Sequence, residues 1–279
     1  MIGCGGYASF AVVRAAQQLG IPTVLLEVNA LPGKVTQMLA KDADRVLVCF
    51  EQAKELLGGG DKIILTGAPV RGEILAADRV RAREKFGLTD DDQLVVSFWG
   101  SMGAKYMNEH MAGELRSMQN SVPYHHVHAT GAAAREWLPR MAKEQGADFD
   151  AHPNIEVTEY IYDMADRMAA ADLIVCRAGA ATLGELCMLG RPALLVPSPY
   201  VAENHQEKNA RALEKEGGCR VLLEKDANPQ VLYDEIQDLL SDRDRLHRMG
   251  HDATKLAAHD ASEKIYQEIL WAIENHGKK

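Results

Sequence analysis

The sequence predicts an α/β protein of two Rossmann-like domains, each with a parallel sheet flanked by helices. Short apolar runs typical of doubly buried strands alternate with segments of about 10–15 residues that have helical spacing. This alternation is typical of βαβ units, in which helices connect parallel strands. A chain of 279 residues is long enough for two such domains.

The expected strands are the apolar runs, which in chain order are Thr23–Leu26, Arg45–Cys49, Ile63–Leu65, Leu94–Phe98, His125–Ala129, Ile155–Val157, Leu173–Cys176, Ala193–Val196 and Val221–Leu223. Helical spacing of apolar side chains predicts helices over Phe10–Leu19, Lys105–Gln119 and Arg135–Gln145. A last helix is expected over Asp260–His276, with four side chains available for packing: Ile265, Ile269, Trp271 and Ile273.

The charged segment Arg71–Asp92 has almost no apolar run, so residues 71–92 are the predicted linker between the domains. Residues 1–70 then form the remnant of a first domain, and residues 93–255 form a complete second domain. Residues 256–279 carry the last helix, which we expect to pack back on the first domain.

Composition narrows the classes of function. The 47% apolar and 25% charged residues are ordinary for a soluble globular protein. Residues 1–73 hold seven basic and seven acidic side chains, whereas the remainder holds 24 basic and 33 acidic ones, so the net charge of −9 lies in the C-terminal part. No basic footprint for nucleic acid is present, and the neutral N-terminal part is the side expected to face any anionic membrane.

The five cysteines are scattered and form no C-x-x-C pair, which indicates neither a zinc site nor a disulfide framework. Such free thiols suit a reducing cytosol. No apolar run approaches the length of a membrane span, and no signal peptide is visible, so any membrane association is expected to be peripheral.

The stretch from Ala171 to Ala210 has the clearest ligand-binding features of the sequence. An expected strand ends before Gly179, a helix carrying Glu185 follows, and a second strand leads to a helix that opens with His205 and Gln206. Small residues at a strand end let a ligand approach the backbone, and a helix N-terminus favours an anion. A carboxylate just inside such a helix can accept both hydroxyls of a ribose.

Five motifs in this order resemble those of the MurG family (glycosyltransferase family 28), and they cover nearly the whole chain. They are the glycine loop from Gly3 to Ser9, the segment Leu26-Glu27-Val28-Asn29-Ala30-Leu31-Pro32-Gly33, Gly67-Ala68-Pro69-Val70-Arg71, Trp99-Gly100-Ser101-Met102-Gly103-Ala104 and the stretch from Ala171 to Ala210. The sequence departs from the family pattern at three positions: Leu26 replaces His, Ala68 replaces Asn and Trp99 replaces Gly.

This resemblance implies the GT-B architecture, in which two Rossmann-like domains face a cleft, here with the first domain incomplete. It also implies an inverting hexosyltransferase of peptidoglycan synthesis, and so of cell wall biogenesis, cell shape and cell division. The implied substrates are UDP-GlcNAc and undecaprenyl-pyrophosphoryl-muramyl-pentapeptide, the conversion of lipid I to lipid II. The implied location is the cytoplasmic face of the bacterial cell membrane, as a peripheral protein.

The implied donor-binding residues are Ser101, Met102, Gly103, Ala104, Ile161, Arg177, Gly179, Glu185, His205, Gln206 and Asn209. The loop at Ser101 can hold a diphosphate through its N–H groups. In the resemblance Glu185 contacts the uridine ribose, Gln206 the GlcNAc ring and the backbone of Ile161 the uracil.

Each donor assignment has a plain structural alternative. The loop at Ser101 can be an ordinary tight turn and Glu185 an N-terminal helix charge. Ile161 can be a core residue, His205 and Asn209 can cap their helix, and Arg177 can pair with a local carboxylate instead of a phosphate.

The implied acceptor-side residues are Gly5, Gly6, Tyr7, Asn29 and Arg71. The two glycines would form a backbone nest for the acceptor's diphosphate, and Arg71 would meet a phosphate or remain a solvated linker charge. The family opens with an earlier glycine loop and its histidine, a natural general base, so we expect an N-terminally truncated copy with impaired transfer.

Three histidines, His125, His126 and His128, lie on one expected strand. No carboxylate or cysteine stands near them at ligand spacing, so a structural role is expected and no metal or other cofactor is predicted. Two other functions remain open: another nucleotide-sugar transferase of the same superfamily acting on a lipid acceptor, and a UDP-sugar-binding module without turnover.

Overall fold

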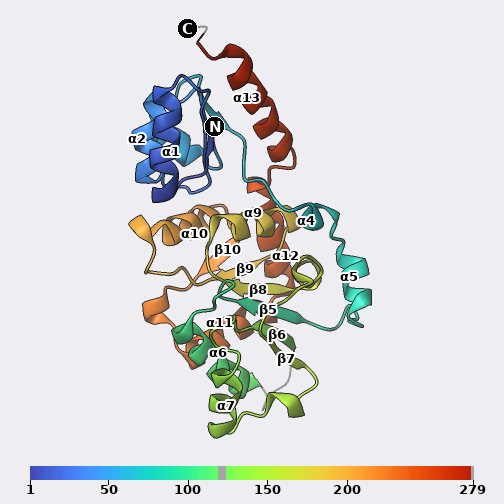
Figure 1. The fold of residues 1–279 in the computed structure, drawn as a ribbon. Helices are drawn as coiled ribbons and strands as arrows, with labels where there is room; N and C mark the ends of the chain where they lie inside the picture. Colours follow the sequence, from blue (N-terminus) through green and yellow to red (C-terminus); the bar gives the residue numbers. More distant parts are fainter. Residues whose placement is uncertain (119–123, 278–279) are drawn as a thin grey trace.

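The computed structural model describes residues 1–118 and 124–277, and it has two α/β domains arranged one above the other (Figure 1). The strands are β1 (Ile2–Gly3), β2 (Val24–Glu27), β3 (Arg45–Val48), β4 (Ile63–Leu65), β5 (Leu94–Phe98), β6 (His125–Ala129), β7 (Ile155–Thr158), β8 (Leu173–Cys176), β9 (Ala193–Leu195) and β10 (Cys219–Val221).

The α-helices are α1 (Tyr7–Gln18), α2 (Lys34–Leu39), α3 (Glu51–Leu56), α4 (Gly72–Ala76), α5 (Arg79–Lys85), α6 (Lys105–Met118), α7 (Trp137–Glu144), α8 (Met164–Ala170), α9 (Ala180–Leu189), α10 (His205–Lys215), α11 (Pro229–Ser241), α12 (Arg243–Ala253) and α13 (Ala261–Asn275). Two single turns matter below, η3 (Ala202–Asn204) and η4 (Glu224–Asp226). In the part of the chain that the structure describes, no helix is long and apolar enough to cross a membrane.

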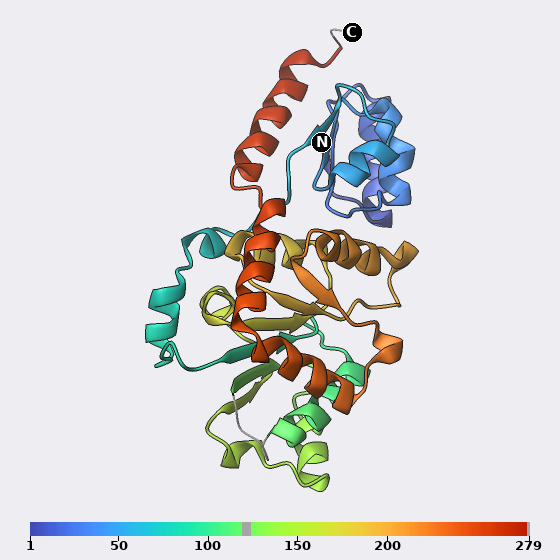
Figure 2. The same ribbon diagram turned by 180° about the vertical axis from the view of Figure 1, so that it is seen from behind.

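The first domain is a four-stranded parallel sheet in the order β1-β2-β3-β4. Alternate residues of its strands point to opposite faces, so Val46 and Val48 pack with α1, α2 and α3 while Leu47 packs with α13. Figure 2 shows α13 beside this sheet, on the side away from α1 and α2.

The second domain is a six-stranded parallel sheet in the order β10-β9-β8-β5-β6-β7. One face packs on α6, α7, α11 and α12, and the other packs on α4, α8, α9 and α10, so both faces are buried. The chain leaves β5 towards one edge through β6 and β7 and then returns beside β5 with β8. This change of direction is a topological switch point, where open α/β sheets bind ligands beyond the carboxyl ends of the strands. The predicted α/β fold with two parallel sheets is confirmed.

The last helix joins the two domains, because it follows the second domain and packs on the first. Arg45 of β3 bonds to Glu268 at 2.6 Å, and its guanidinium carbon lies 3.2 Å from the ring centroid of Trp271. Ile265 and Ile269 pack against the first sheet, but Ile273 is 60% exposed and does not. The expected contact by Ile273 is therefore wrong, because that residue lies on the solvent face of the helix.

The segment predicted as a linker carries two helices, α4 and α5, which pack on α9 and α8 of the second domain. Arg83 of α5 is buried and bonds to Asp172 and to the Ala170 carbonyl oxygen. The charge of this segment predicts a solvated linker, but two of its arginines donate hydrogen bonds to the backbone carbonyl oxygens at the end of α8. The last strand is also displaced, to Cys219–Val221, because its register is set by pairing with Ala193–Leu195 of β9.

Candidate active site

The candidate site lies at the carboxyl edge of the second sheet, facing the first domain. The segments after β5 and β9 meet the start of α10 there and enclose a cavity of about 350 Å³. It is lined by Trp99, Gly103, Ala104, Lys105, Tyr106, Arg177, Ser198, Tyr200, Gln206 and Glu224. Four of the predicted donor residues, Gly103, Ala104, Arg177 and Gln206, are therefore brought together.

The loop between β5 and α6 is held at Gly103 by a close backbone approach. Gly103 has φ +72°, and a Cβ built on it would lie 2.1 Å from the Thr130 carbonyl oxygen, so only glycine fits. Asn108 of α6 donates to that same carbonyl at 2.8 Å. Among the described residues, the backbone N–H groups of Ser101, Met102 and Ala104 donate no hydrogen bond, so they are available to an anion.

Gln206 is positioned at the start of α10 with half of its amide free. Its Oε1 accepts from the Ser198 N–H at 2.8 Å, and in the described part of the chain its Nε2 has no partner. The segment just before it is strained, because Glu203 and Asn204 have φ values of 55° and 51°. Glu203 pairs with Lys34 of the first domain at 3.0 Å, a contact across the cleft that the sequence did not indicate.

His205 is half-exposed beside Gln206 and donates through Nδ1 to the Ala202 carbonyl at 2.9 Å. A carbonyl oxygen only accepts, so this bond assigns the Nδ1–H tautomer. His205 thus holds the η3 turn against α10. This contact is similar to the helix-capping role that is the alternative to sugar binding for this residue.

Arg177 is committed to a local carboxylate. Its Nη2 lies 2.5 Å from Glu224 of η4, its Nη1 donates to the Val196 carbonyl, and its guanidinium carbon lies 5.7 Å from the Trp99 ring centroid. Of the two partners that the sequence left open for Arg177, the local carboxylate is the one present here. Gly179 begins α9 with φ −67°, and an added Cβ would meet only Thr182 at 3.9 Å, so no steric need for glycine exists there.

Glu185 of α9 makes a two-pronged ion pair with Arg71 at the junction of the domains. Arg71 Nε and Nη2 lie 2.7 and 3.2 Å from the two carboxylate oxygens. The hydrogen bond to Glu185 raises the pKa of Arg71. Glu185 is predicted to bind the donor and Arg71 to lie on the acceptor side, and the structure joins these two residues in one ion pair. Each carboxylate oxygen keeps a second lone pair for a ligand hydroxyl.

Asn209, one of the predicted donor-binding residues, is fully buried between the domains. Its Oδ1 accepts from the Ala30 N–H at 2.8 Å, and its Nδ2 donates to Asn29 Oδ1 at 3.1 Å and to the Ala178 carbonyl at 3.5 Å. All of its polar atoms are used, so it holds the first domain to the second and has none left for a sugar.

Asn29 belongs to the same junction and is organised by Glu27, which sequence reasoning missed. The buried Glu27 carboxylate accepts from Asn29 N and Nδ2, both at 3.1 Å, and from Gly33 N and Thr36 Oγ1 at 2.9 and 2.7 Å. These four bonds fix the turn from β2 into α2. The only signal of this role in the sequence is that Glu27 lies two residues before Asn29, within the same motif.

The predicted glycine nest of the first domain is open. Gly5 and Gly6 have φ +80° and +76°, with no atom within 4 Å of an added Cβ, and Tyr7 is 85% exposed at the start of α1. Ile161 follows β7, the edge strand of the second sheet, and its side chain is buried in the core. Beside it, at the carboxyl ends of β6 and β7, is a second hollow of about 480 Å³ that includes Thr130, Glu159, Tyr160 and Tyr162.

Below the Gly103 loop runs a buried chain of polar side chains. Ser97 Oγ lies 2.8 Å from both His126 Nε2 and His128 Nδ1, and His128 Nε2 lies 3.1 Å from Asn108 Oδ1. Because Asn108 Oδ1 only accepts, His128 is the Nε2–H tautomer, Ser97 donates to its Nδ1, and His126 Nε2–H donates to Ser97. The predicted structural role for His126 and His128 fits these hydrogen bonds, which hold Asn108 and, through it, the Gly103 loop. His125 takes no part in them: it is half-exposed and lies 3.6 Å from Asp92.

Beyond His126, these buried polar side chains end at Glu114, which is fully buried and accepts a hydrogen bond from Tyr124 at 2.6 Å. Its Oε2 lies 3.4 Å from His126 Nδ1. Burial raises the pKa of Glu114 to about 8 and lowers that of His128 to about 3, so both groups are neutral in the folded protein near pH 7. A neutral carboxyl and neutral imidazoles avoid the cost of buried charge.

Glu114 should therefore make the protein less stable as pH rises from 6.5 to 8. The unfolded carboxyl, with its ordinary pKa of 4.5, has lost its proton in this window, while the folded one still holds it. The loss is up to about 1.4 kcal/mol of unfolding free energy per pH unit. Urea denaturation at the two pH values measures it. Glu114→Gln keeps both contacts without the titration and should remove the slope; an equal slope in the variant would contradict the assignment.

Comparison with known proteins shows the family to which this chain is similar. The model of the glycosyltransferase family 28 C-terminal domain matches residues 94–265, and the model of the family's N-terminal domain matches residues 1–48. The UDP-N-acetylglucosamine–N-acetylmuramyl-(pentapeptide) pyrophosphoryl-undecaprenol N-acetylglucosamine transferase of Acetivibrio thermocellus is 42% identical over 275 residues, which cover 99% of this chain and 73% of the relative. The protein of the same name from Desulforamulus reducens is 41% identical over 265 residues, 95% of this chain and 71% of the relative.

Solved structures of other proteins have the same fold as this chain. MurG of Acinetobacter baumannii superimposes with a TM-score of 0.76 at 29% identity, covering 96% of this chain and 72% of the MurG chain. The UDP complex of S. aureus MnaA has a TM-score of 0.72 at 17% identity, which shows a shared fold alone. The resemblance predicted from the five motifs is confirmed. The chain belongs to glycosyltransferase family 28, and its relatives at 42% and 41% identity place it in the MurG group of that family.

Proposed function

We propose that this chain transfers N-acetylglucosamine from UDP-N-acetylglucosamine to undecaprenyl-pyrophosphoryl-muramyl-pentapeptide in peptidoglycan synthesis. The names of its relatives at 42% and 41% identity describe this transfer. The structural observation that carries the proposal is the cavity at the carboxyl edge of the second sheet, which joins the Gly103 loop to Gln206. Among the described residues, the N–H groups beside Gly103 donate no hydrogen bond and the Nε2 of Gln206 has no partner. The carboxylate of Glu185 lies at the domain junction, where it pairs with Arg71.

In the proposed complex the diphosphate of the donor lies at the loop between β5 and α6. The N–H groups of Ser101, Met102 and Ala104 and the first turn of α6 face it, and Lys105 adds a positive charge at the cavity wall. The ribose hydroxyls bond to Glu185, and the Nε2 of Gln206 donates to a hydroxyl of the sugar. Uracil occupies the hollow beside Ile161.

The reaction is one in-line displacement with inversion. The C4 hydroxyl of the muramyl sugar gives its proton to a general base while its oxygen attacks the anomeric carbon. The bond from that carbon to the β-phosphate oxygen breaks, and UDP leaves with the electron pair. Charge that develops on the diphosphate is stabilised by fixed N–H dipoles that need no reorganisation during the reaction. Because the acceptor is lipid-linked, we place the chain at the cytoplasmic face of the membrane as a peripheral protein.

Donor binding should not require a metal ion. The described residues contain no group of three or more His, Cys, Asp or Glu side chains that could hold one. We expect the Kd for UDP in excess EDTA to lie within about twofold of the Kd with added magnesium, since backbone N–H groups and Lys105 take the place of the ion. Calorimetric titration measures both values. A gain of about tenfold or more from magnesium would contradict the proposed neutralisation of the diphosphate.

A transfer assay tests the function itself. Radiolabelled UDP-GlcNAc and a soluble analogue of the lipid-linked muramyl-pentapeptide are incubated with the protein, with labelled UDP-glucose as the competing donor. We expect label in the acceptor from UDP-GlcNAc and much less from UDP-glucose. UDP binding without transfer to the acceptor would instead support a binding module, and equal transfer from both donors would contradict the proposed specificity.

A further inference from the structure

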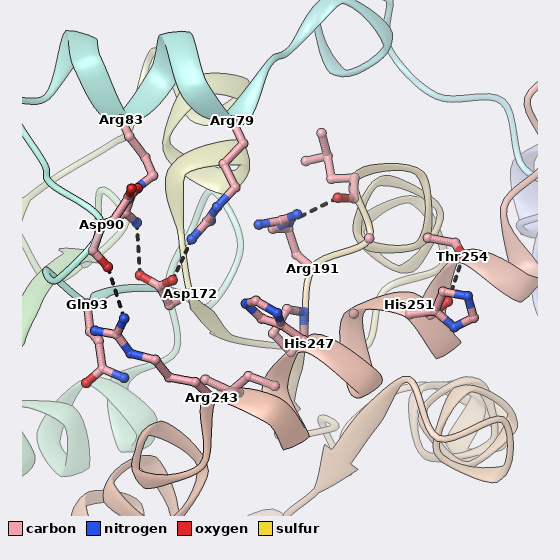
Figure 3. A pocket seen from close by; sticks show the side chains of 15 residues that line it. Arg79, Arg83, Asp90, Gln93, Asp172, Arg191, Arg243, His247, His251 and Thr254 are labelled. Carbon is pink, nitrogen blue, oxygen red and sulfur yellow. Dashed lines mark hydrogen bonds and ion pairs between the residues drawn. The ribbon is translucent and has the colours of Figure 1, made fainter.

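A second cavity lies at the opposite, amino-terminal edge of the second sheet, away from the proposed donor site. Its volume is about 670 Å³, within the range of small-molecule sites. Its wall is formed by the residues that precede β5, β8 and β9, together with α5 and α12 (Figure 3). Nothing in the proposed transfer reaction uses this cavity.

The cavity is basic although the chain as a whole carries a formal charge of −9. Its lining contains four arginines and two histidines against two aspartates. The arginines are Arg79, Arg83, Arg191 and Arg243, and the histidines are His247 and His251. Three separate segments of the chain therefore place cationic groups around one hollow.

Two of these arginines share one carboxylate within the protein. Arg79 and Arg83 both pair with Asp172, at 2.5 and 3.0 Å, and both also bond to carbonyl oxygens at the end of α8. Arg243 bonds to the carbonyl oxygens of Asp90 and Asp91, at 3.1 and 2.8 Å, and holds the loop before β5. These contacts build the wall of the cavity.

Arg191 differs from Arg79 and Arg83 because it has no carboxylate partner among the described residues. Arg243 shares this feature, but its side chain is exposed whereas Arg191 is partly buried. Its Nε and Nη1 donate to the carbonyl oxygens of Leu189 and Ala171, at 3.0 and 3.4 Å, which are neutral acceptors. Burial, and next the charge of Arg79, lower the pKa of Arg191 to about 10. A partly buried guanidinium that lies beside other cations, with no carboxylate paired to it, is stabilised by an anion that enters the cavity.

His247 of α12 faces the same hollow as Arg191 in Figure 3, and it has no hydrogen-bond or ion-pair partner in the described part of the chain. The position of α12 is fixed by close packing, because a Cβ added to Gly250 would lie 2.5 Å from the Gly190 carbonyl oxygen. Arg191, whose bonds are to neutral carbonyl oxygens only, and His247 are therefore held by rigid elements on one side of the cavity.

We propose that this cavity binds a phosphate-bearing anion through Arg191 and His247. Donors that converge from α12 and from the turn before β9 suit the several oxygens of a tetrahedral phosphate. The volume exceeds that of phosphate alone, which indicates a phosphorylated small molecule or the headgroup of an anionic phospholipid. The site is separate from the donor cleft, so this proposal does not depend on the function proposed above.

Calorimetric titration with inorganic pyrophosphate tests the site, with UDP present in saturating amount so that the donor cleft is filled. We expect Arg191→Gln to weaken binding about tenfold or more and His247→Gln to weaken it by a smaller factor. Arg248→Gln is the matched control: it removes the same charge from α12, at a side chain that is 67% exposed and does not line the cavity. It should leave the affinity within about twofold, because surface charges are screened.

A second arm separates the two sources of phosphate. Co-sedimentation with phosphatidylglycerol vesicles, compared with phosphatidylcholine vesicles, shows whether a lipid headgroup is bound. Arg191-dependent binding to either probe supports the proposal and assigns its source. If Arg191→Gln fails to fold, as judged by its thermal melt, the partner-free His247 provides the test. Absence of binding to both probes, or an equal loss in Arg248→Gln, would overturn the proposal.

Discussion

Gly103→Ala should abolish measurable UDP binding and lower the free energy of unfolding by about 3 kcal/mol or more. The added methyl group would lie 2.1 Å from the Thr130 carbonyl oxygen, and φ +72° is unfavourable for alanine as well. Because the obstacle is backbone, the loop must move, and its N–H groups then leave the positions proposed for the diphosphate. Calorimetry with UDP and urea denaturation measure the two effects.

Gly100→Ala is the control within the same loop. Gly100 also has a positive φ, +88°, but an added Cβ would meet nothing within 4 Å. In this variant only the strain of alanine in a left-handed backbone conformation should lower the free energy of unfolding, by about 1 kcal/mol. The variant should keep most of its UDP affinity. Equal losses in the two variants would show that backbone strain alone, and not the contact with Thr130, decides the shape of the loop.

Glu185→Ala should weaken UDP binding by about 1.5–3 kcal/mol, which is roughly tenfold to more than a hundredfold in Kd. The variant removes the proposed acceptor of two ribose hydroxyls, but it also removes the ion pair with Arg71. The two causes must therefore be separated by a second variant.

Arg71→Ala makes that separation, because it breaks the ion pair and leaves the carboxylate. Arg71 is half-exposed, with 48% of its side chain accessible, so the pair itself should contribute little to stability. We expect the UDP affinity of Arg71→Ala to stay within about threefold of the wild type. A loss as large as that of Glu185→Ala would assign Glu185 to the domain junction instead of the ribose.

The sheets could be predicted from the sequence because each buried parallel strand reads as a continuous apolar run. Leu94–Phe98 and Leu173–Cys176 have the predicted bounds for this reason. Helices α4 and α5 could not be predicted, because they are short and charged and their arginines bond to carbonyl groups distant in the chain. Short helices gain their stability from such tertiary contacts.

The candidate site could be predicted only as far as loops at strand ends determine it. The Gly103 loop and Gln206 lie where the motifs indicated, since their positions follow from strand and helix boundaries. The bonds of Asn209 to Ala30 and of Arg177 to Glu224 join residues far apart in sequence. No local pattern contains the partner in these cases, so Asn209 appears in a sequence motif as a binding residue although its bonds are structural.

The most direct test of the proposed donor site is a crystal structure of this chain with UDP. We expect the diphosphate oxygens within hydrogen-bond distance of the N–H groups of Met102 and Ala104, and the ribose hydroxyls on the carboxylate of Glu185. UDP bound at this edge of the second sheet, with Glu185 still paired only to Arg71, would contradict the ribose assignment. UDP bound elsewhere in the molecule would contradict the donor site as a whole.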